Sequence, residues 1–187
     1  MSVSGQIVYW QVTNSGDLDL MTVDIAQPHQ VRALISTTAS ERNGDVSPDG
    51  AWLAYESTES GRYEVYVRPF RTGTEGRMQI STSGGKQPRW APSGREFFYF
   101  NDEGELMVVS MQTGGSPLKV GTPSKVLDAK YFAGEPGTNA RTYDVAPDGR
   151  FLMIKNPAES SGGGDLPDHL VVVGNWREEL KARLGGQ

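Results

Sequence analysis

The stretch that decides the fold is the turn Ser47-Pro48-Asp49-Gly50, which leads into the apolar run Trp52-Leu53-Ala54-Tyr55. Proline presets the first corner of such a turn, aspartate caps its own backbone, and glycine accepts a positive φ at the exit. The same combination returns at Ala91-Pro92-Ser93-Gly94 and at Ala146-Pro147-Asp148-Gly149, each time before another apolar run. The prolines are 44 and 55 residues apart, so the chain is predicted to be a repeat protein.

The N-terminal residues carry a further copy of this repeat, beginning at Gly5. An offset of 45 residues aligns two glycines and two strand-like runs: Gly5 with Gly50, Gly16 with Gly61, Ile7–Trp10 with Trp52–Tyr55, and Leu18–Met21 with Tyr63–Tyr66. Short outer strands are expected at 31–35, 77–81 and 124–127, after further turns rich in glycine, serine and threonine. Every unit therefore contains several short strands joined by tight turns.

Four antiparallel strands in 44 or 45 residues are typical of one blade of a β-propeller. The predicted fold is all-β: a partial β-propeller of about four four-stranded blades, with no innermost strand in the first blade and no outermost strand in the last. The blade units are placed at approximately 1–38, 39–83, 84–129 and 130–174. Leucine-rich repeats are too short for this period, and helical arrays need an amphipathic pattern that is absent.

A short C-terminal helix is predicted over residues 175–185. Asn175 is a suitable N-cap with Glu178 three residues later, and Gly185 is suited to ending the helix. Trp176, Leu180 and Leu184 form one apolar stripe, which is expected to pack across the last blade.

Composition excludes several classes of protein. The 187 residues include no cysteine, which removes disulfides, thiolate metal sites and cysteine nucleophiles. The net charge of -5 gives no electrostatic support for nucleic-acid binding. No apolar run approaches the roughly 20 residues of a membrane helix, so membrane insertion is not expected. Residues 1–5 lack the basic and apolar regions of a signal peptide, so any such segment is expected outside this sequence.

Four motifs together resemble the repeat of the Tol-system translocation protein TolB: Val46–Gly50, Glu64–Phe70, Gly84–Trp90 and Val171–Leu180. They are more similar still to the TolB-like propellers at the C-terminal end of bacterial membrane-bound serine/threonine kinases. The resemblance implies a protein-interaction or sensing propeller in the bacterial periplasm or on an extracytoplasmic face, with no activity of its own. No His-Arg-Asp or Asp-Phe-Gly kinase motif occurs, and no tryptophan precedes an aspartate as in WD repeats.

The predicted blade count departs from this family, whose propellers usually have six or more blades. The chain therefore resembles the C-terminal part of a longer propeller. An open arc of blades would expose apolar faces and strand edges, which monomers avoid. Either a preceding part of the chain completes the ring or two copies join head to tail. A homodimer with about eight blades is predicted.

Propellers usually bind ligands where the innermost strands line the central channel. Aligning the units on the turn proline gives recurring polar residues at three positions: Asp45, Arg89 and Asp144; Asn43, Gln87 and Thr142; Arg42, Lys86 and Arg141. As a set they predict a site at the channel mouth for a protein, a peptide or a small anionic ligand. The alternative for any single residue is an ion pair with the neighbouring blade.

The second hypothesis is an enzymatic function. The chain would then be a small metal-dependent ester or phosphoester hydrolase, with a divalent ion in a channel formed between subunits. His29 and His169 lie at non-equivalent places, so a shared histidine site is not expected. Oxygen ligands from Asn43, Asp45 and Asp144 leave a calcium site open. No Gly-x-Ser-x-Gly motif occurs, and the primary prediction has no catalytic residue, metal or cofactor.

Overall fold

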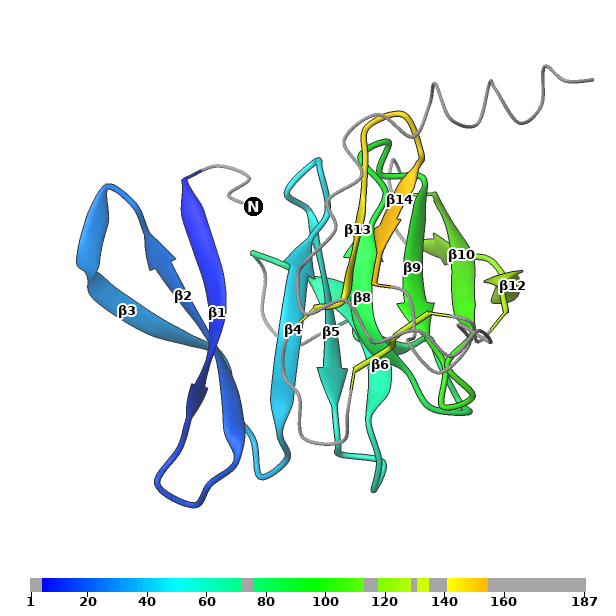
Figure 1. Cartoon of the computed structure of the whole chain (residues 1–187). Coiled ribbons are helices and arrows are strands. Elements are labelled where there is room, and N and C mark those ends of the chain that lie inside the picture. The colour runs from blue at the N-terminus through cyan, green and yellow to red at the C-terminus, as the bar shows by residue number, and fades with distance from the viewer. Residues whose placement is uncertain (1–4, 72–75, 113–117, 129–130, 135–140, 155–187) are drawn as a thin grey trace, which may run out of the picture. The chain divides into compact units, whose positions relative to one another are not determined.

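The computed structural model describes residues 5–71, 76–112, 118–128, 131–134 and 141–154, and these residues form an all-β structure (Figure 1). No helix occurs among them. The helix predicted at 175–185 lies outside the described residues. The strands form four antiparallel sheets in chain order, as a partial propeller requires.

The four sheets are built from consecutive stretches of chain. The first sheet has the order β1 (Gln6–Val12), β2 (Leu18–Asp24), β3 (Gln27–Ile35). The second has the order β4 (Glu41–Val46), β5 (Trp52–Ser57), β6 (Glu64–Pro69), β7 (Met78–Gln79). The third contains β8 (Lys86–Trp90), β9 (Glu96–Phe100) and β10 (Leu106–Gln112), with β11 (Lys119–Val120) and β12 (Ser124–Leu127) both paired to β10. The fourth pairs β13 (Tyr143–Val145) with β14 (Phe151–Met153).

The repeated proline turn has the same geometry in the second, third and fourth sheets. The turn glycine donates its N–H to the carbonyl three residues earlier at 2.8 Å in Gly50 and at 2.9 Å in both Gly94 and Gly149. Their φ angles are 71°, 67° and 81°, in the region where only glycine is unstrained. The turn predicted from the sequence is confirmed, and in each sheet it joins the innermost strand to the next.

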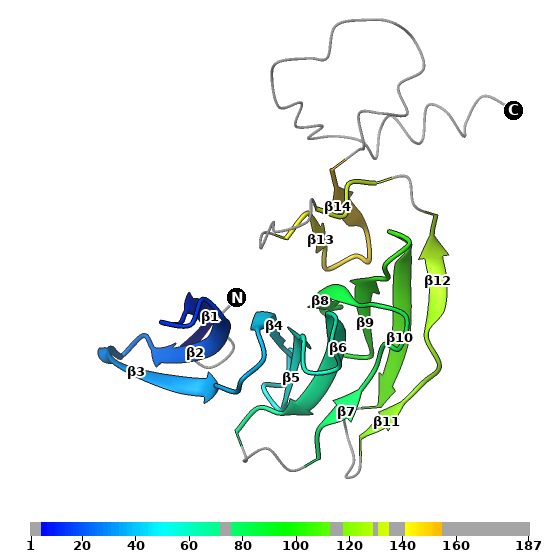
Figure 2. The same ribbon diagram turned by 90° about the horizontal axis from the view of Figure 1, so that it is seen from below.

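Figure 2 shows the ribbons of the sheets seen from below. Apolar clusters fill the space between consecutive sheets. Leu20 of the first sheet packs with Leu53, Tyr55 and Tyr66 of the second. On its other face, the second sheet contributes Ala54, Val65 and Val67 to a cluster with Trp90, Phe97, Tyr99 and Val109 of the third. The third sheet in turn packs Phe98, Phe100 and Leu106 against Tyr143 and Val145 of the fourth. Each sheet thus shields its neighbour's face, which is how propeller blades stabilise one another.

The offset of 45 residues is wrong by one for β1. Trp10 pairs with Leu20, whereas Glu56 pairs with Val65. Since Leu20 and Val65 are equivalent at the offset of 45, Trp10 is equivalent to Glu56 and not to Tyr55. The cause is the hairpin loop, which is residues 13–17 in the first sheet and the longer 58–63 in the second. A one-residue change in a hairpin loop reverses the face of every side chain on one strand.

The outer strands differ in length from the expectation. β12 has the predicted bounds, β7 is shorter, and β3 begins at Gln27 instead of Val31. Pro28 argues against a strand in an interior position, but β3 is the edge of its sheet, where a missing N–H costs no ladder bond. The short strand β11 was not predicted from the sequence.

Candidate functional site

The innermost strands β4 and β8 both bulge at the same point of the repeat. Asn43 and Gln87 each stand five residues before the turn proline, and their φ angles are 51° and 56°. The ladder register shifts there in both strands. A left-handed conformation is uncommon for residues other than glycine. The hydrogen bonds that hold these two residues therefore identify the contacts that shape the inner strands.

Those bonds converge on Glu56, a carboxylate with no exposed surface. Arg42 donates from Nε to Oε2 at 2.6 Å, and Asn43 donates from Nδ2 to Oε1 at 2.7 Å. The backbone N–H of Gln87 donates to Oε1 from the third sheet. The guanidinium of Arg42 also lies 3.8 Å from the ring centroid of Tyr63. This buried ion pair is hydrogen-bonded on both carboxylate oxygens, and it links two sheets.

A second network joins the second, third and fourth sheets. Arg89 contacts Asp45 at 3.0 Å and Asp144 at 2.8 Å, and Arg141 reaches Asp45 at 3.2 Å. The other oxygen of Asp45 accepts the N–H of Trp90 at 2.8 Å. Burial lowers the pKa of Arg89, but the charges of Asp45 and Asp144 outweigh that effect and hold the pKa above its usual value. Two guanidinium groups and two carboxylates balance in charge.

Gln87 makes a further link through its side chain. Its Oε1 accepts the N–H of Thr142 at 2.8 Å, and its Nε2 donates to the carbonyl of Ala133 at 2.9 Å. The hydroxyl of Tyr143 donates to the carbonyl of Gln87 at 2.8 Å, and burial raises the pKa of this phenol well above its usual value. Thr142 and Gln87, equivalent in sequence, are thus direct partners in the structure.

Eight of the nine aligned residues lie in these contacts, and one of them, Thr142, does so through Gln87. Arg42, Asn43 and Gln87 surround Glu56, and Asp45, Arg89, Arg141 and Asp144 form the second network. Lys86 lies apart, in a partly exposed ion pair with Asp102 at 3.1 Å.

Glu56 is the residue that the sequence analysis missed. The available signal was a charged residue continuing the apolar run 52–55. The contacts also bear on ligand binding, because an anion approaching Arg89 or Arg141 would compete with carboxylates already in place.

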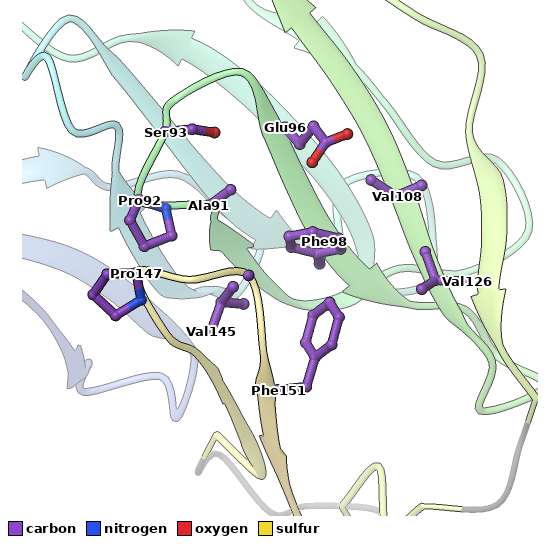
Figure 3. Close-up of a pocket in the computed structure, with 11 residues that line it drawn as sticks. Ala91, Pro92, Ser93, Glu96, Phe98, Val108, Val126, Val145, Pro147 and Phe151 are labelled. Atoms are coloured by element: carbon purple, nitrogen blue, oxygen red, sulfur yellow. The ribbon is translucent and has the colours of Figure 1, made fainter. Parts of the chain in front are cut away.

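A cavity of about 340 Å³ opens between the third and fourth sheets, beside two of the proline turns (Figure 3). Its walls are mainly apolar, and they include Phe98, Val108, Val126, Val145 and Phe151. Phe98 and Phe151 meet edge to face, with ring centroids 4.8 Å apart. Glu96 and Ser93 are the polar side chains among the lining residues. A mainly apolar cavity with a few polar groups is typical of a ligand or peptide site.

Metal-binding groups do not gather in the part of the chain that the structure describes. No set of three or more His, Cys, Asp or Glu side chains that could hold a metal ion occurs there. His29 lies on the exposed strand β3, and His169 lies outside the described residues. Nor do the described residues include a helix long and apolar enough to span a membrane.

No protein-family model and no curated protein matches the chain. Among solved structures, the putative TolB from Agrobacterium tumefaciens superimposes with a TM-score of 0.52 at 16% sequence identity, covering 80% of this chain and 53% of that one. TolB from Acinetobacter baumannii gives a TM-score of 0.51 at 18% identity, covering 84% of this chain and 48% of that one. The chain spans about half the length of these structures.

With its consecutive antiparallel sheets, each shielding a face of the next, the described part of the chain has the fold of a β-propeller. More specifically, this fold is TolB-like, as the repeat motifs predicted. The similarity to kinase propellers stays a prediction.

Proposed function

We propose that the chain is a non-catalytic TolB-like propeller module that binds a protein or peptide beside the proline turns. The observation that carries this proposal is the apolar cavity between the third and fourth sheets. It opens next to Pro92 and Pro147, at the end of the inner strands where the channel mouth is expected (Figure 3). Apolar and aromatic walls with a carboxylate among them suit an apolar side chain that is followed by a basic one.

The inner-strand networks support a binding role over a catalytic one. Catalytic acids and bases need access to a substrate, whereas Glu56 is fully buried and Asp45 is largely so. Their charges are balanced by arginine side chains of the same networks. These contacts join neighbouring sheets, which is a structural function.

The partner surfaces of the module are proposed from its exposed apolar side chains. Ile7 is exposed on the first sheet, and Leu152 and Ile154 on or just after the last described strand. We infer that a second copy covers both surfaces in a head-to-tail homodimer. Extracytoplasmic location follows from the family resemblance and is part of the same proposal.

The peptide proposal is tested by selecting binders from a random peptide library displayed on phage, using the full chain as bait. Enriched sequences are expected to share an apolar residue next to lysine or arginine. Synthetic peptides are then titrated calorimetrically against the wild-type chain and the Val126→Glu variant. We expect at least about a tenfold loss of affinity, because a carboxylate in the cavity is desolvated by the peptide.

Val31→Glu is the matched control. Val31 has 46% of its surface exposed, is not among the residues that line the cavity, and lies outside the proposed dimer surfaces. Its variant is expected to bind the selected peptides as the wild type does. Equal binding by the Val126 variant, or no enriched peptide at all, would contradict the proposal. Light scattering at several concentrations tests the homodimer separately, and a monomer at every concentration would exclude it.

A further inference from the structure

The first sheet differs from the second and third in having no described strand on the inner side of β1. In the second sheet β4 pairs with β5 at that position, and in the third sheet β8 pairs with β9. β1 is the equivalent of β5, because Trp10 occupies the position of Glu56. Among the described residues β1 pairs with β2 alone, so one edge of β1 is open.

The hydrogen bonds of the first hairpin show which backbone groups lie on that open edge. The N–H of Thr13 donates to the carbonyl of Asp17 at 2.8 Å. At the other end, the N–H of Ile25 donates to the carbonyl of Gly5 at 2.7 Å. Hydrogen-bonded pairs alternate along an antiparallel ladder, so the odd-numbered residues of β1 bond to β2. The residues whose N–H and C=O groups point to the open edge are therefore the even-numbered ones, Gln6, Val8, Trp10 and Val12.

The second sheet packs on the face of β1 and leaves the edge position open. A Cβ atom on Gly44 of β4 would lie 2.9 Å from Val8 Cγ1, which places β4 against the face of the first sheet. At the next junction, β8 contacts Glu56 of β5 while β4 stays paired with β5. A strand added to β1 would thus have the surroundings that β4 has. It would also cover Trp10 and Val12, which have 37% and 56% of their surface exposed.

The opposite edge of the first sheet, β3, is less suited to strand addition. β3 contains Pro28, and its ladder with β2 shifts register twice. Proline and irregular pairing are features that protect edge strands from further pairing. β1 instead pairs with β2 over its seven residues without a shift. A regular open edge is what an extended segment needs in order to add as a strand.

The hairpin that carries the open edge is acidic. Residues 5–31 include Asp17, Asp19 and Asp24, and they contain no lysine or arginine. Within the described part of the chain, none of these three aspartates takes part in an ion pair. Complementary charge steers association and selects partners, so a basic segment is favoured at this edge.

We propose that β1 binds an extended, basic segment of a partner protein along its open edge, which adds a fourth strand to the first sheet. Main-chain hydrogen bonds to the even-numbered residues of β1 supply affinity, and alternate side chains supply specificity. The segment combines lysine or arginine with β-branched or aromatic residues, as the charge of the hairpin and the strand geometry require. The site is separate from the cavity between the third and fourth sheets and does not rest on the proposed function.

The test is phage selection of random peptides on the full chain, followed by calorimetric titration of the enriched peptides against variants. Val12→Pro removes one N–H from the open edge, and proline is tolerated at an edge, so the variant is expected to fold. Peptides bound along β1 are expected to lose affinity at least about tenfold. Val12→Thr keeps the N–H and is the matched control, with binding within about twofold of the wild type. A peptide held in the other cavity is instead weakened by Val126→Glu and not by Val12→Pro.

A second measurement distinguishes strand addition from binding through side chains alone. Each residue of an enriched peptide is N-methylated in turn, and every analogue is titrated against the wild-type chain. Methylation is expected to weaken binding at least about tenfold at every second residue, where the N–H points to β1. The residues between, whose N–H groups point away from β1, are expected to tolerate it. This alternation does not depend on the folding of any variant.

Three outcomes would overturn the proposal. One is a selection that yields no peptide weakened by Val12→Pro. Another is a loss of affinity that does not alternate along the N-methylated series, which would assign binding to side chains. The third is a dimer of the full chain that Val12→Pro converts to monomers in light scattering, because a second copy would then occupy the edge.

Discussion

The second sheet packs against the third sheet on one face and the first sheet on the other, and two of its three buried glutamates differ in their surroundings. Glu56, facing the third sheet, accepts hydrogen bonds on both carboxylate oxygens. Glu41, at the start of β4, accepts from Thr37 at 2.6 Å and from Ser57 at 3.3 Å, both on Oε1. Its Oε2 is buried with no hydrogen-bond partner among the described residues.

The two faces of the second sheet therefore differ in how their buried carboxylates are paired. Where the second sheet meets the third, both carboxylate oxygens of Glu56 are paired and apolar side chains fill the junction, and Nε1 of Trp52 is the buried group there without a hydrogen bond among the described residues. Towards the first sheet, an unpaired oxygen and a cavity with two arginines remain. Unpaired buried groups reduce stability. Substitutions where the second sheet meets the first are therefore expected to cost less free energy of unfolding than substitutions where it meets the third.

The largest effect is expected from Glu56→Ala. This change leaves the buried guanidinium of Arg42 without its carboxylate and the Gln87 N–H without its acceptor. Breaking a buried ion pair in this way costs about 3–5 kcal/mol, measured as the free energy of unfolding in urea. Glu105→Ala, at a partly exposed pair, is the control and is expected to cost less than about 1 kcal/mol. A cost below about 1 kcal/mol for Glu56→Ala would contradict the conclusion that Glu56 is the better paired of the two glutamates.

Asp45→Asn is expected to have the next largest effect. Asparagine can still accept the N–H of Trp90, but it removes the charge that Arg89 and Arg141 share. The expected cost is about 2–3 kcal/mol, from weakened charge-assisted hydrogen bonds.

A double-mutant cycle with Arg141→Met sharpens the Asp45 measurement. Because the two side chains are in contact, the Asp45→Asn cost should shrink in the Arg141→Met background. Strictly additive costs would show that the contact does not contribute in solution. Asp148→Asn, at an exposed pair, provides the control for loss of charge alone.

Glu41→Gln is expected to change stability in the opposite direction. Burial raises the pKa of Glu41, and the charge of Asp19 adds to this, while hydrogen bonds from Thr37 and Ser57 oppose it. The folded state therefore holds the proton more tightly than the unfolded state. The carboxyl group's contribution is most favourable at low pH and is lost as the pH rises above its ordinary value of 4.5.

Glutamine carries no charge at either pH, so the advantage of Glu41→Gln should grow with pH. A gain of about 1 kcal/mol is expected at pH 8 and a smaller one at pH 5, measured by thermal or urea unfolding. Glu56→Gln is the matched comparison and should destabilise at both values. A loss of stability at pH 8 for Glu41→Gln would mean that Oε2 has a partner in solution.

The smallest effect is expected for Lys125→Met. Lys125 bridges Glu105 and Asp128 at 3.0 Å each on the surface of the third sheet. Exposed pairs contribute about 0.5 kcal/mol or less. The change in unfolding free energy should vanish in 0.5 M salt, and a salt-independent loss above about 1 kcal/mol would show packing that the contacts do not reveal.

The sequence predicts the fold well because local chemistry determines it. The proline turns require a short-range combination of Pro, Asp or Ser, and Gly, and each occurs where it was expected. Alignment on those turns also picked out inner-strand residues that, apart from Lys86, contact one another or Glu56. The face of β1 was mispredicted, because one residue in a hairpin loop has no strong sequence signal.

The individual contacts could not be predicted for a different reason. Asn43 and Gln87 take a left-handed conformation without being glycine, so nothing local marks the bulges that bring their bonds to Glu56. The cavity with Arg68 and Arg77 depends on how two sheets are placed against each other, which is a matter of packing and not of periodicity. Equivalent positions predict which residues gather, whereas register and packing decide what they contact.

Urea unfolding of Glu56→Ala and Glu41→Gln at pH 8 tests the contrast between the two glutamates most directly. The expected result is a loss of about 3–5 kcal/mol in the free energy of unfolding for Glu56→Ala and a gain of about 1 kcal/mol for Glu41→Gln. That pattern would mean that the paired carboxylate of Glu56 holds the second and third sheets together, whereas the charge of Glu41 is poorly matched by its partners. Losses of similar size for both variants would contradict the account, because they would show that the two carboxylates are equally well paired in solution.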